Sequence, residues 1–278
     1  METRKVWFIT GASKGLGLAL VKELLARGYR VSATSRKLTG FENKIQEHPN
    51  FLPLEVDITD EESVQRAIDQ TLQSFGRLDV VVNNAGFGQL GTLEELTHRE
   101  ARENFDTNVF GVLNVIRSAT PYLRQQRHGH IINISSIAGF YGEFGGWGVY
   151  NATKFAVAGL TEAFYAEMKP FGVHATIVYP GYFRTNFLEG GSLKTAETKI
   201  EDYQDVRASE KAHIEDIAGN QPGSPEKAAV AIVDMVQTEN PPLHLFLGSD
   251  SFGLANAKLE ILTNAIGNNE AVSKSTDY

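Results

Sequence analysis

Cysteine is absent from the 278 residues, and so is any long hydrophobic run. Without cysteine the chain has no disulfide, no thiolate metal ligand and no cysteine nucleophile, and it suits a reducing compartment. Four histidines fall in or beside expected strands without the spacing of a metal site: His128, His130, His174 and His244. We interpret them as structural and expect no bound metal.

Charge of one sign is not concentrated anywhere in the chain. The chain contains 26 Lys and Arg residues and 34 Asp and Glu residues, which gives a net charge of −8 at pH 7, and no block of like charge occurs. This balance argues against nucleic acid and anionic membranes as partners. Near the N-terminus only four consecutive apolar residues, 6–9, precede polar and glycine-rich sequence, too few for a signal peptide or a membrane span. We therefore expect a cytoplasmic protein.

Short apolar runs alternate with segments of helical periodicity along most of the chain. The run Val6-Trp7-Phe8-Ile9 is typical of a strand buried on both faces of a parallel sheet. Further strands are expected at residues 30–34, 51–56, 79–83, 130–134, 172–178 and 243–247. The alternation predicts a single α/β domain over residues 1–278, with a doubly wound, mainly parallel sheet and helices on both faces.

The pattern changes after Thr185. Residues 186–222 are polar and contain no clear strand, which favours a mobile substrate lid over an idle loop. Helices are expected again at 225–236 and 253–266, and the tail at 267–278 is expected to be frayed.

A glycine-rich turn, Thr10-Gly11-Ala12-Ser13-Lys14-Gly15-Leu16-Gly17, joins the first strand to a helix. Such a turn directs backbone N–H groups and a helix N-terminus at a phosphate. The spacing is G-x-x-x-G-x-G, and an ordinary glycine-rich loop is the alternative. The strand at 30–34, directly after the helix, favours a dinucleotide site.

Cations stand where an NAD-selective site would carry an acidic residue, roughly 20 residues past the glycines. The sequence there is Ser35-Arg36-Lys37. Arg36 would bind a ribose 2′-phosphate, and Lys14 would add a second charge near it. Solvated surface charge is the alternative for each residue, but the missing acid and the two cations together favour NADP(H) over NAD(H).

Five residues fall together at the carboxyl ends of the expected strands, where ligands bind in doubly wound sheets. They are Thr10, Asp57, Asn83, Ser136 and Pro180, and Asp57 could accept from an adenine amino group. Tyr150 and Lys154 follow on an expected helix, four residues apart and therefore on one face. A lysine so placed favours the phenolate and makes the tyrosine a usable acid or base.

These motifs together resemble the short-chain dehydrogenase/reductase family, in its compact single-domain branch, over about residues 5–250. The matching elements are T-G-x-x-x-G-x-G at 10–17, Asn83-Asn84-Ala85-Gly86, Asn108, Ser136, Tyr150 with Lys154, and Pro180-Gly181 with Thr185. The resemblance implies a Rossmann fold and an oxidoreductase that transfers a hydride between the nicotinamide and a carbonyl or alcohol.

The resemblance also implies residue roles. Tyr150 would be the general acid/base, Ser136 would polarise the substrate oxygen, and Lys154 would lower the phenol pKa and hold the nicotinamide ribose. Asn108 would support a proton-supplying water chain. The implied cofactor-binding residues are Gly11, Ser13, Lys14, Gly15, Leu16, Gly17, Arg36, Asp57, Ile58, Asn83, Ala85, Gly86, Tyr150, Lys154, Pro180, Gly181, Phe183 and Thr185. Of these, Thr185 and the backbone near Pro180 and Gly181 would bind the nicotinamide carboxamide.

Two local features leave alternatives. Ser135 competes with Ser136, which is preferred because Ile137-Ala138-Gly139 behind it matches the family. Ser136 also precedes Tyr150 by 14 positions, one more than in many relatives, and the glycine-rich loop 142–148 would hold the extra residue.

Aromatic residues near the site suit an apolar small-molecule substrate. They are Tyr141, Phe144, Trp147, Tyr182, Phe183 and Phe187, for which core packing is the alternative. Rival functions are a 3-oxoacyl thioester reductase of lipid synthesis, which should carry a basic patch for its acidic carrier, and a non-catalytic dinucleotide-sensing protein. Family members commonly associate through long helices, so we expect a homodimer or homotetramer.

Overall fold

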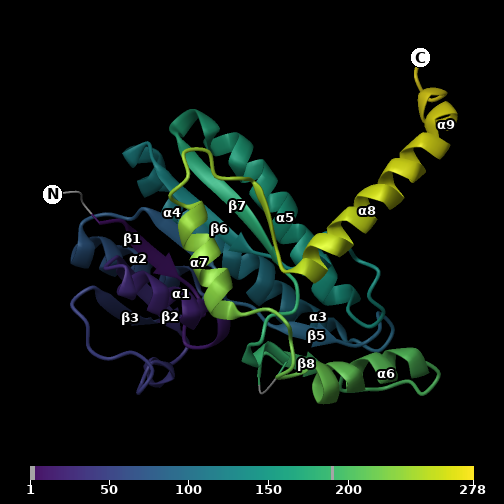
Figure 1. Cartoon of the computed structure of the whole chain (residues 1–278), viewed down its shortest axis with the longest axis horizontal. Coiled ribbons are helices and arrows are strands. Elements are labelled where there is room, and N and C mark those ends of the chain that lie inside the picture. Colours follow the sequence, from purple (N-terminus) through teal and green to yellow (C-terminus); the bar gives the residue numbers. More distant parts are fainter. Residues whose placement is uncertain (1–3, 189–190) are drawn as a thin grey trace.

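Seven strands form one sheet in which every neighbouring pair is parallel, in the order β3-β2-β1-β4-β6-β7-β9 (Figure 1). The computed structural model describes residues 4–188 and 191–278. Residues 1–3 and 189–190, the latter within the expected lid, lie outside the described residues. The strands are β1 (Val6–Ile9), β2 (Arg30–Ser35), β3 (Phe51–Glu55), β4 (Val80–Asn83), β6 (Gly129–Ile134), β7 (Val173–Pro180) and β9 (His244–Leu247). The expected fold class is confirmed.

Helices cover both faces of this sheet (Figure 1). The helices of the described residues are α1 (Gly15–Ala26), α2 (Glu61–Phe75), α3 (His98–Phe105), α4 (Gly111–Gln126), α5 (Gly148–Met168), α6 (Gln204–Lys211), α7 (Pro225–Met235), α8 (Ser249–Asn268) and α9 (Glu270–Lys274), and not all of them lie on the sheet. Strand alternation explains the two layers, because Phe8 packs in a core with α2, α4 and α5 while Trp7 and Ile9 pack in a second core with α1 and α7. Each such buried side chain contributes about 1.5–3 kcal/mol.

Three segments differ from the expectations. The single helix expected around 105–123 is divided by a π-helical turn, η2 (Asp106–Phe110), between α3 and α4. The segment 186–222, expected to hold no strand, contains β8 (Leu193–Thr195), which pairs with β5 (Gly88–Leu90), as well as α6 and a second π-helical turn, η6 (Ala212–Ile217). The tail expected to be frayed from 267 is helical to Lys274 and projects from the body with α8 (Figure 1).

Candidate active site

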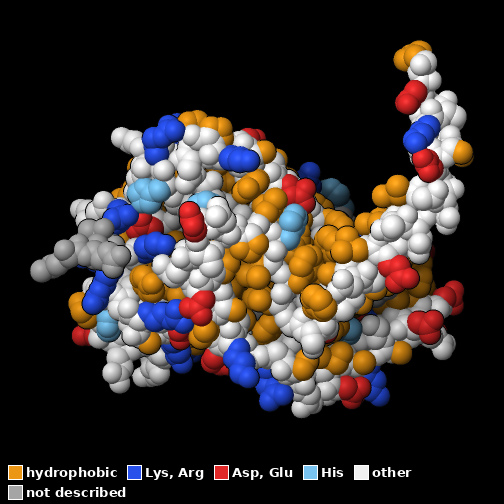
Figure 2. Space-filling model, turned by 45° about the horizontal axis from the view of Figure 1, so that its top comes forward, with side chains coloured by type: hydrophobic (Ala, Val, Ile, Leu, Met, Phe, Trp, Pro, Cys, Tyr) orange, Lys and Arg blue, Asp and Glu red, His pale blue; other side chains and the backbone are white. Residues whose placement is uncertain are grey.

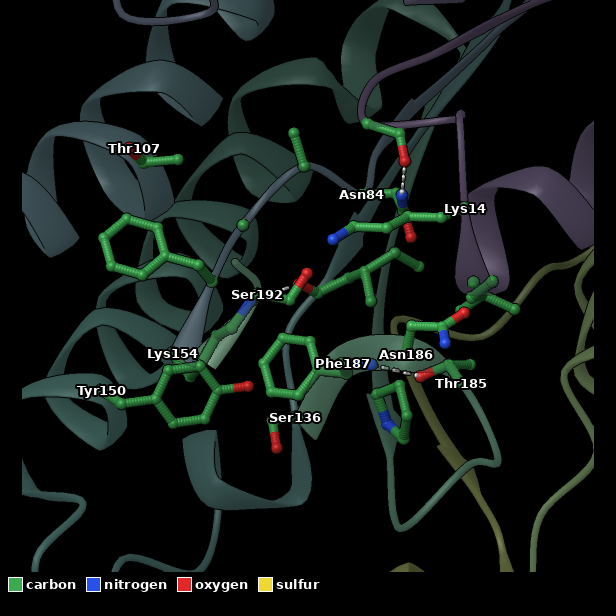
Figure 3. A pocket seen from close by; sticks show the side chains of 18 of the residues that line it. Lys14, Asn84, Thr107, Ser136, Tyr150, Lys154, Thr185, Asn186, Phe187 and Ser192 are labelled. Carbon is green, nitrogen blue, oxygen red and sulfur yellow. Dashed lines mark hydrogen bonds between the residues drawn. The ribbon is translucent and has the colours of Figure 1, made fainter. Parts of the chain in front are cut away.

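A cavity of about 940 Å³ lies at the carboxyl ends of the sheet strands (Figure 3). Most of the expected site residues line it. They are Gly11, Ser13, Lys14, Gly15, Leu16, Arg36, Asp57, Ile58, Ala85, Gly86, Ser136, Tyr150, Lys154, Pro180, Gly181, Phe183 and Thr185. Gly17, Asn83 and Asn108 are not among the lining residues.

The glycine turn is held by close backbone packing. Gly11 has a φ of +62°, and a side chain there would bring its Cβ within 2.7 Å of the Ala85 Cα. A Cβ on Gly17 would come within 2.6 Å of the Asn84 amide nitrogen. Gly17 therefore allows α1 to approach the loop after β4, and its place among the cofactor contacts stays a prediction.

The loop after β4 is tied to the glycine turn through Thr10. Its hydroxyl oxygen accepts from the backbone N–H groups of Asn84 and Ala85, both at 3.0 Å, and the Asn84 amide donates to the Thr10 and Gly11 carbonyls. Asn83 is buried in the sheet and donates to the Asn133 side chain. Asn84, which the sequence reasoning did not select, lines the cavity in place of Asn83.

Three cations gather beside the glycine turn. Lys14 and Arg36 line the cavity, and Lys44 donates from Nζ to the Ser13 carbonyl at 2.9 Å. Burial lowers the pKa of Lys14, and the charges of Arg36 and Lys44 lower it further. In residues 4–188 and 191–278 no carboxylate lies within ion-pair distance of the three. The cluster is therefore a positive site without a neighbouring counter-charge. No sequence motif pointed to Lys44 as a member of this cluster.

The Tyr150 phenol and the Ser136 hydroxyl lie close together in the same cavity (Figure 3). Burial raises the pKa of Tyr150 to about 12; the hydrogen bond from Ser136 opposes this shift and Tyr182 adds to it. Ser135 points elsewhere, because its hydroxyl donates to the Lys154 carbonyl at 2.9 Å. The geometry thus brings Ser136, not Ser135, to the tyrosine.

Lys154 is buried beside Tyr150 on α5. Its Nζ donates to the Ile134 carbonyl at 3.0 Å and lies 5.7 Å from the centre of the Tyr150 ring. Burial lowers the pKa of Lys154 to about 8. The expectation that Lys154 lowers the pKa of the phenol is not met in this geometry, because desolvation of Tyr150 outweighs every other influence on it.

Asn108 lies in the π-helical turn η2 and is buried behind the cavity. Its side-chain oxygen accepts from the Phe87 N–H, and its amide nitrogen donates to the Phe87 carbonyl and to the Thr153 hydroxyl at 3.1 Å. These bonds connect the loop after β4 with α5 next to Lys154. An irregular helical turn of this kind frequently marks a functional site.

Aromatic side chains form the other end of the cavity. Trp147 packs on Tyr150 with ring centres 5.5 Å apart, and Phe187 packs on it at 6.0 Å. Of the six aromatic residues expected there, Tyr141 is not among the lining residues. His213, which the sequence reasoning did not consider, lines this end and contacts Trp147 at 5.1 Å between ring centres.

Residues 4–188 and 191–278 contain no group of three or more His, Asp or Glu side chains arranged to hold a metal ion. Among the helices of the same residues, none has the length and apolarity needed to cross a bilayer.

A parallel sheet whose carboxyl edge combines a glycine turn with a serine and a buried tyrosine defines a dinucleotide-binding oxidoreductase. Residues 5–195 match the family model described as short chain dehydrogenase. The chain belongs to this family, whose fold binds a nicotinamide dinucleotide and whose members interconvert CH–OH and C=O groups of small molecules.

Relatives of similar length support this assignment. Oxidoreductase BOA17 of Botryotinia fuckeliana is 34% identical over 262 residues, covering 93% of this chain and 94% of the relative. The 3-ketodihydrosphingosine reductase of Bacteroides thetaiotaomicron is 37% identical over 246 residues, covering 88% of each. A solved short-chain dehydrogenase from Streptomyces avermitilis is 36% identical with a TM-score of 0.90, covering 99% of this chain and 100% of that one.

More distant solved structures of the same fold carry either dinucleotide. ElxO is described with NADP bound, at 28% identity and a TM-score of 0.74, covering 90% of this chain and 99% of that one. A family member from Burkholderia phymatum is described with NAD, at 21% identity and a TM-score of 0.81, covering 95% and 96%.

Proposed function

We propose that the protein is an NADP-dependent reductase of apolar ketones or aldehydes, able to run in reverse on the corresponding alcohols. The observation that carries this proposal is one cavity with uncompensated cations at one end, the Ser136–Tyr150 pair in the middle and an aromatic wall beyond. The relative named 3-ketodihydrosphingosine reductase supports a ketone as substrate.

The lining residues fit a phosphorylated dinucleotide. The glycine turn and the N-terminus of α1 would hold the pyrophosphate, and Lys14, Arg36 and Lys44 would hold the 2′-phosphate. Asp57 and Ile58 would contact the adenine, with the Asp57 carboxylate already oriented by the Thr59 hydroxyl at 2.7 Å. Lys154 would hold the nicotinamide ribose, and Thr185 with the Pro180-Gly181 backbone would hold the carboxamide.

The nicotinamide supplies the hydride when bound. The chain supplies orientation and a proton. Because burial raises the pKa of Tyr150, its phenol is protonated at neutral pH and donates to the oxygen that gains charge on the substrate. The Ser136 hydroxyl donates to the same oxygen, which two positioned donors stabilise better than water does. Asn108 positions the loop after β4 against α5, where a proton would be resupplied.

Cofactor choice is tested by mixing the protein with an apolar ketone and either reduced cofactor. We expect NADPH oxidation, followed by absorbance, with kcat/KM at least about 10-fold above that with NADH, because three cations lack a counter-charge. Oxidation of neither cofactor across a panel of apolar ketones would favour a dinucleotide sensor, and turnover of 3-oxoacyl thioesters alone would favour the lipid-synthesis alternative.

The matched variant is Arg36→Asp, which places the carboxylate of an NAD-selective site at this position. It should reverse the preference and leave kcat with NADH close to the wild-type value. Lys37→Asp, one residue on and outside the cavity lining, is the control for the charge change itself. If Arg36→Asp and Lys37→Asp alter the preference equally, Arg36 does not select the cofactor.

We also propose that residues 1–278 form one domain, with a substrate lid at 186–222 and a homodimer or homotetramer as the working state. Several residues of this segment, among them Phe187 and His213, line the cavity, which supports the lid. The projecting helix α8 supports assembly with a second copy. Figure 2 shows apolar side chains gathered beside its base, and exposed apolar residues continue along the helix as Phe252, Leu259, Ile261, Leu262 and Ile266.

Assembly through α8 is tested by light scattering. Residues 252, 255, 259, 262 and 266 are apolar at alternating spacings of three and four, which is the pattern of a helix that packs on another helix. We expect two or four times the chain mass of 30.5 kDa, reduced in the double variant Leu259→Glu/Leu262→Glu. Asn264→Glu, exposed on the opposite side of the helix from this stripe, should leave the mass unchanged. A monomeric wild-type protein would refute the proposal.

A further inference from the structure

Tyr182 and His213 form a hydrogen-bonded pair in the wall of the active-site cavity. Tyr182 follows β7, and His213 lies in the π-helical turn η6, so the two come from distant parts of the sequence. The Tyr182 Oη lies 2.8 Å from the His213 Nε2. Both side chains line the same cavity as Ser136 and Tyr150. Neither has a part in the transfer of hydride or proton described above.

The direction of the hydrogen bond follows from the other nitrogen of the imidazole. The His213 Nδ1 lies 2.7 Å from the Ser209 carbonyl oxygen, and a carbonyl can only accept. Nδ1 therefore carries the hydrogen, and in the neutral ring Nε2 is an acceptor. Burial raises the pKa of Tyr182, so its phenol keeps the proton that Nε2 accepts. The only hydrogen of the Tyr182 hydroxyl is thus directed away from any substrate.

Contacts on every side hold this pair in place. The Tyr182 backbone N–H donates to the Asp250 carboxylate at 2.7 Å, which fixes the turn after β7 against α8. The His213 ring packs between Trp147, at 5.1 Å between ring centres, and Tyr182, at 5.8 Å. Tyr182 is also close enough to Tyr150 to influence its ionisation. The phenol oxygen of Tyr182 therefore offers fixed lone pairs, and no donor, near the reacting carbonyl.

We propose that Tyr182 and His213 form a second substrate subsite, which accepts a hydrogen bond from a hydroxyl or amino group carried a short distance from the reacting carbonyl. The inference rests on the proposed reductase function and narrows its substrate to hydroxy or amino ketones with an otherwise apolar body. An analogue without that donor leaves the accepting lone pairs of the Tyr182 oxygen without a partner once the analogue has displaced water, which is how a polar site rejects an apolar analogue.

The wild-type protein tests the subsite without any variant. Three ketones with the same carbon skeleton are compared with NADPH: one with a hydroxyl next to the carbonyl, one with a methoxy group there and one with hydrogen. We expect kcat/KM for the hydroxy ketone to exceed both others by about 10-fold or more, because only it donates. Equal values for the three ketones would overturn the subsite.

Tyr182→Phe removes the accepting oxygen and keeps the ring. The ratio of kcat/KM between the hydroxy ketone and the unsubstituted ketone should fall to about 1 in this variant. Tyr165→Phe, an equivalent change on α5 remote from the cavity lining, should keep the wild-type ratio. A variant that merely loosens the wall lowers kcat/KM for both ketones and leaves the ratio intact, and that result would also overturn the proposal.

His213→Phe tests the direction of the hydrogen bond. Without the Nε2 acceptor, the Tyr182 hydroxyl is free to turn its hydrogen toward the substrate. In this variant the ratio of kcat/KM for the methoxy ketone to kcat/KM for the hydroxy ketone should then be about 10-fold higher than in the wild-type protein. An unchanged ratio would show that His213 does not orient Tyr182. Reduction of none of the three ketones by wild type would instead refute the proposed function, so the two failures are distinguishable.

Discussion

Replacement of Tyr150 by Phe is expected to lower kcat for ketone reduction by about 10²–10⁴-fold, the contribution of a positioned general acid. The ring and its contacts with Trp147 and Phe187 remain, so the cavity keeps its shape. The proton donor is lost, and Ser136 alone must stabilise the charge on the substrate oxygen. Because the pKa of Tyr150 is about 12, the wild-type phenol is protonated throughout the neutral range.

Two measurements separate this chemical effect from damage to the fold. NADPH binding, followed by quenching of protein fluorescence, should be retained in Tyr150→Phe, since the phenol oxygen is not needed to hold the phosphates. Tyr165→Phe on the same helix should turn over ketones at the wild-type rate. Near-normal turnover by Tyr150→Phe would remove Tyr150 from the mechanism, whatever the fate of the cofactor.

Replacement of Lys154 by Met should abolish detectable reduction and yet stabilise the protein at pH 7. Burial lowers the pKa of Lys154 from 10.5 to about 8, so at neutral pH the folded state holds a charge that it disfavours. A pKa shift of this size corresponds to a cost of about 3 kcal/mol in the free energy of unfolding, which the methionine variant would avoid. Loss of the hydrogen bond to Ile134 would reduce this gain by about 1 kcal/mol. We expect a net gain of about 2 kcal/mol in the free energy of unfolding.

The stability advantage of the methionine variant is expected to depend on pH in one direction. The folded pKa lies below the unfolded one, so the stability linked to neutral Lys154 is present above pH 10.5 and is lost as pH falls through about 8. Below pH 8 the cost is complete, and there the methionine variant should gain most. Its advantage should shrink between pH 8 and 10.5 in urea unfolding curves, while Lys22→Met at an exposed position should show no such trend. A methionine variant less stable than wild type at pH 7 would contradict the buried charge.

The trade between stability and activity at Lys154 follows from its place in the cavity. The residue is buried at the cavity wall, and among the described residues its ammonium donates a hydrogen bond to the Ile134 carbonyl alone. A buried cation with so little compensation is costly to keep, and such costs concentrate at functional sites. The ribose hydroxyls of the proposed cofactor would provide the acceptors that the ammonium lacks.

Local sequence was sufficient for the seven strands of the main sheet and for most of the cavity, although not for β5, β8 or α6. Buried parallel strands are apolar runs, so they could be recognised from the sequence. Parallel pairing then brings their carboxyl ends to one edge of the sheet. Thr10, Asp57, Ser136 and Pro180 could be gathered from that rule alone. The four-residue spacing placed Tyr150 and Lys154 on one helical face, because helical geometry depends only on neighbours along the chain.

Side-chain direction at the strand ends was decided by tertiary structure. The sequence could not tell which of two adjacent asparagines faces the cavity, and the pleat of β4 turns Asn83 into the sheet while Asn84 bonds the glycine turn. It also left Ser135 beside Ser136 as an alternative, which the bond from Ser135 to Lys154 removes. One step along a strand reverses the direction of a side chain, so a motif placed to within a residue does not yet place its atoms.

The sequence by itself therefore determined a parallel α/β sheet, a glycine-rich turn between strand and helix, and a tyrosine–lysine pair on one helical face, all of which follow from periodicity and spacing. Only the tertiary structure brought Lys44 to the cation cluster, placed Asn108 in a π-helical turn, and set His213 against Tyr182. Those contacts join residues far apart in the chain. Their formation depends on how loops pack after the sheet has formed, and no local pattern encodes that packing.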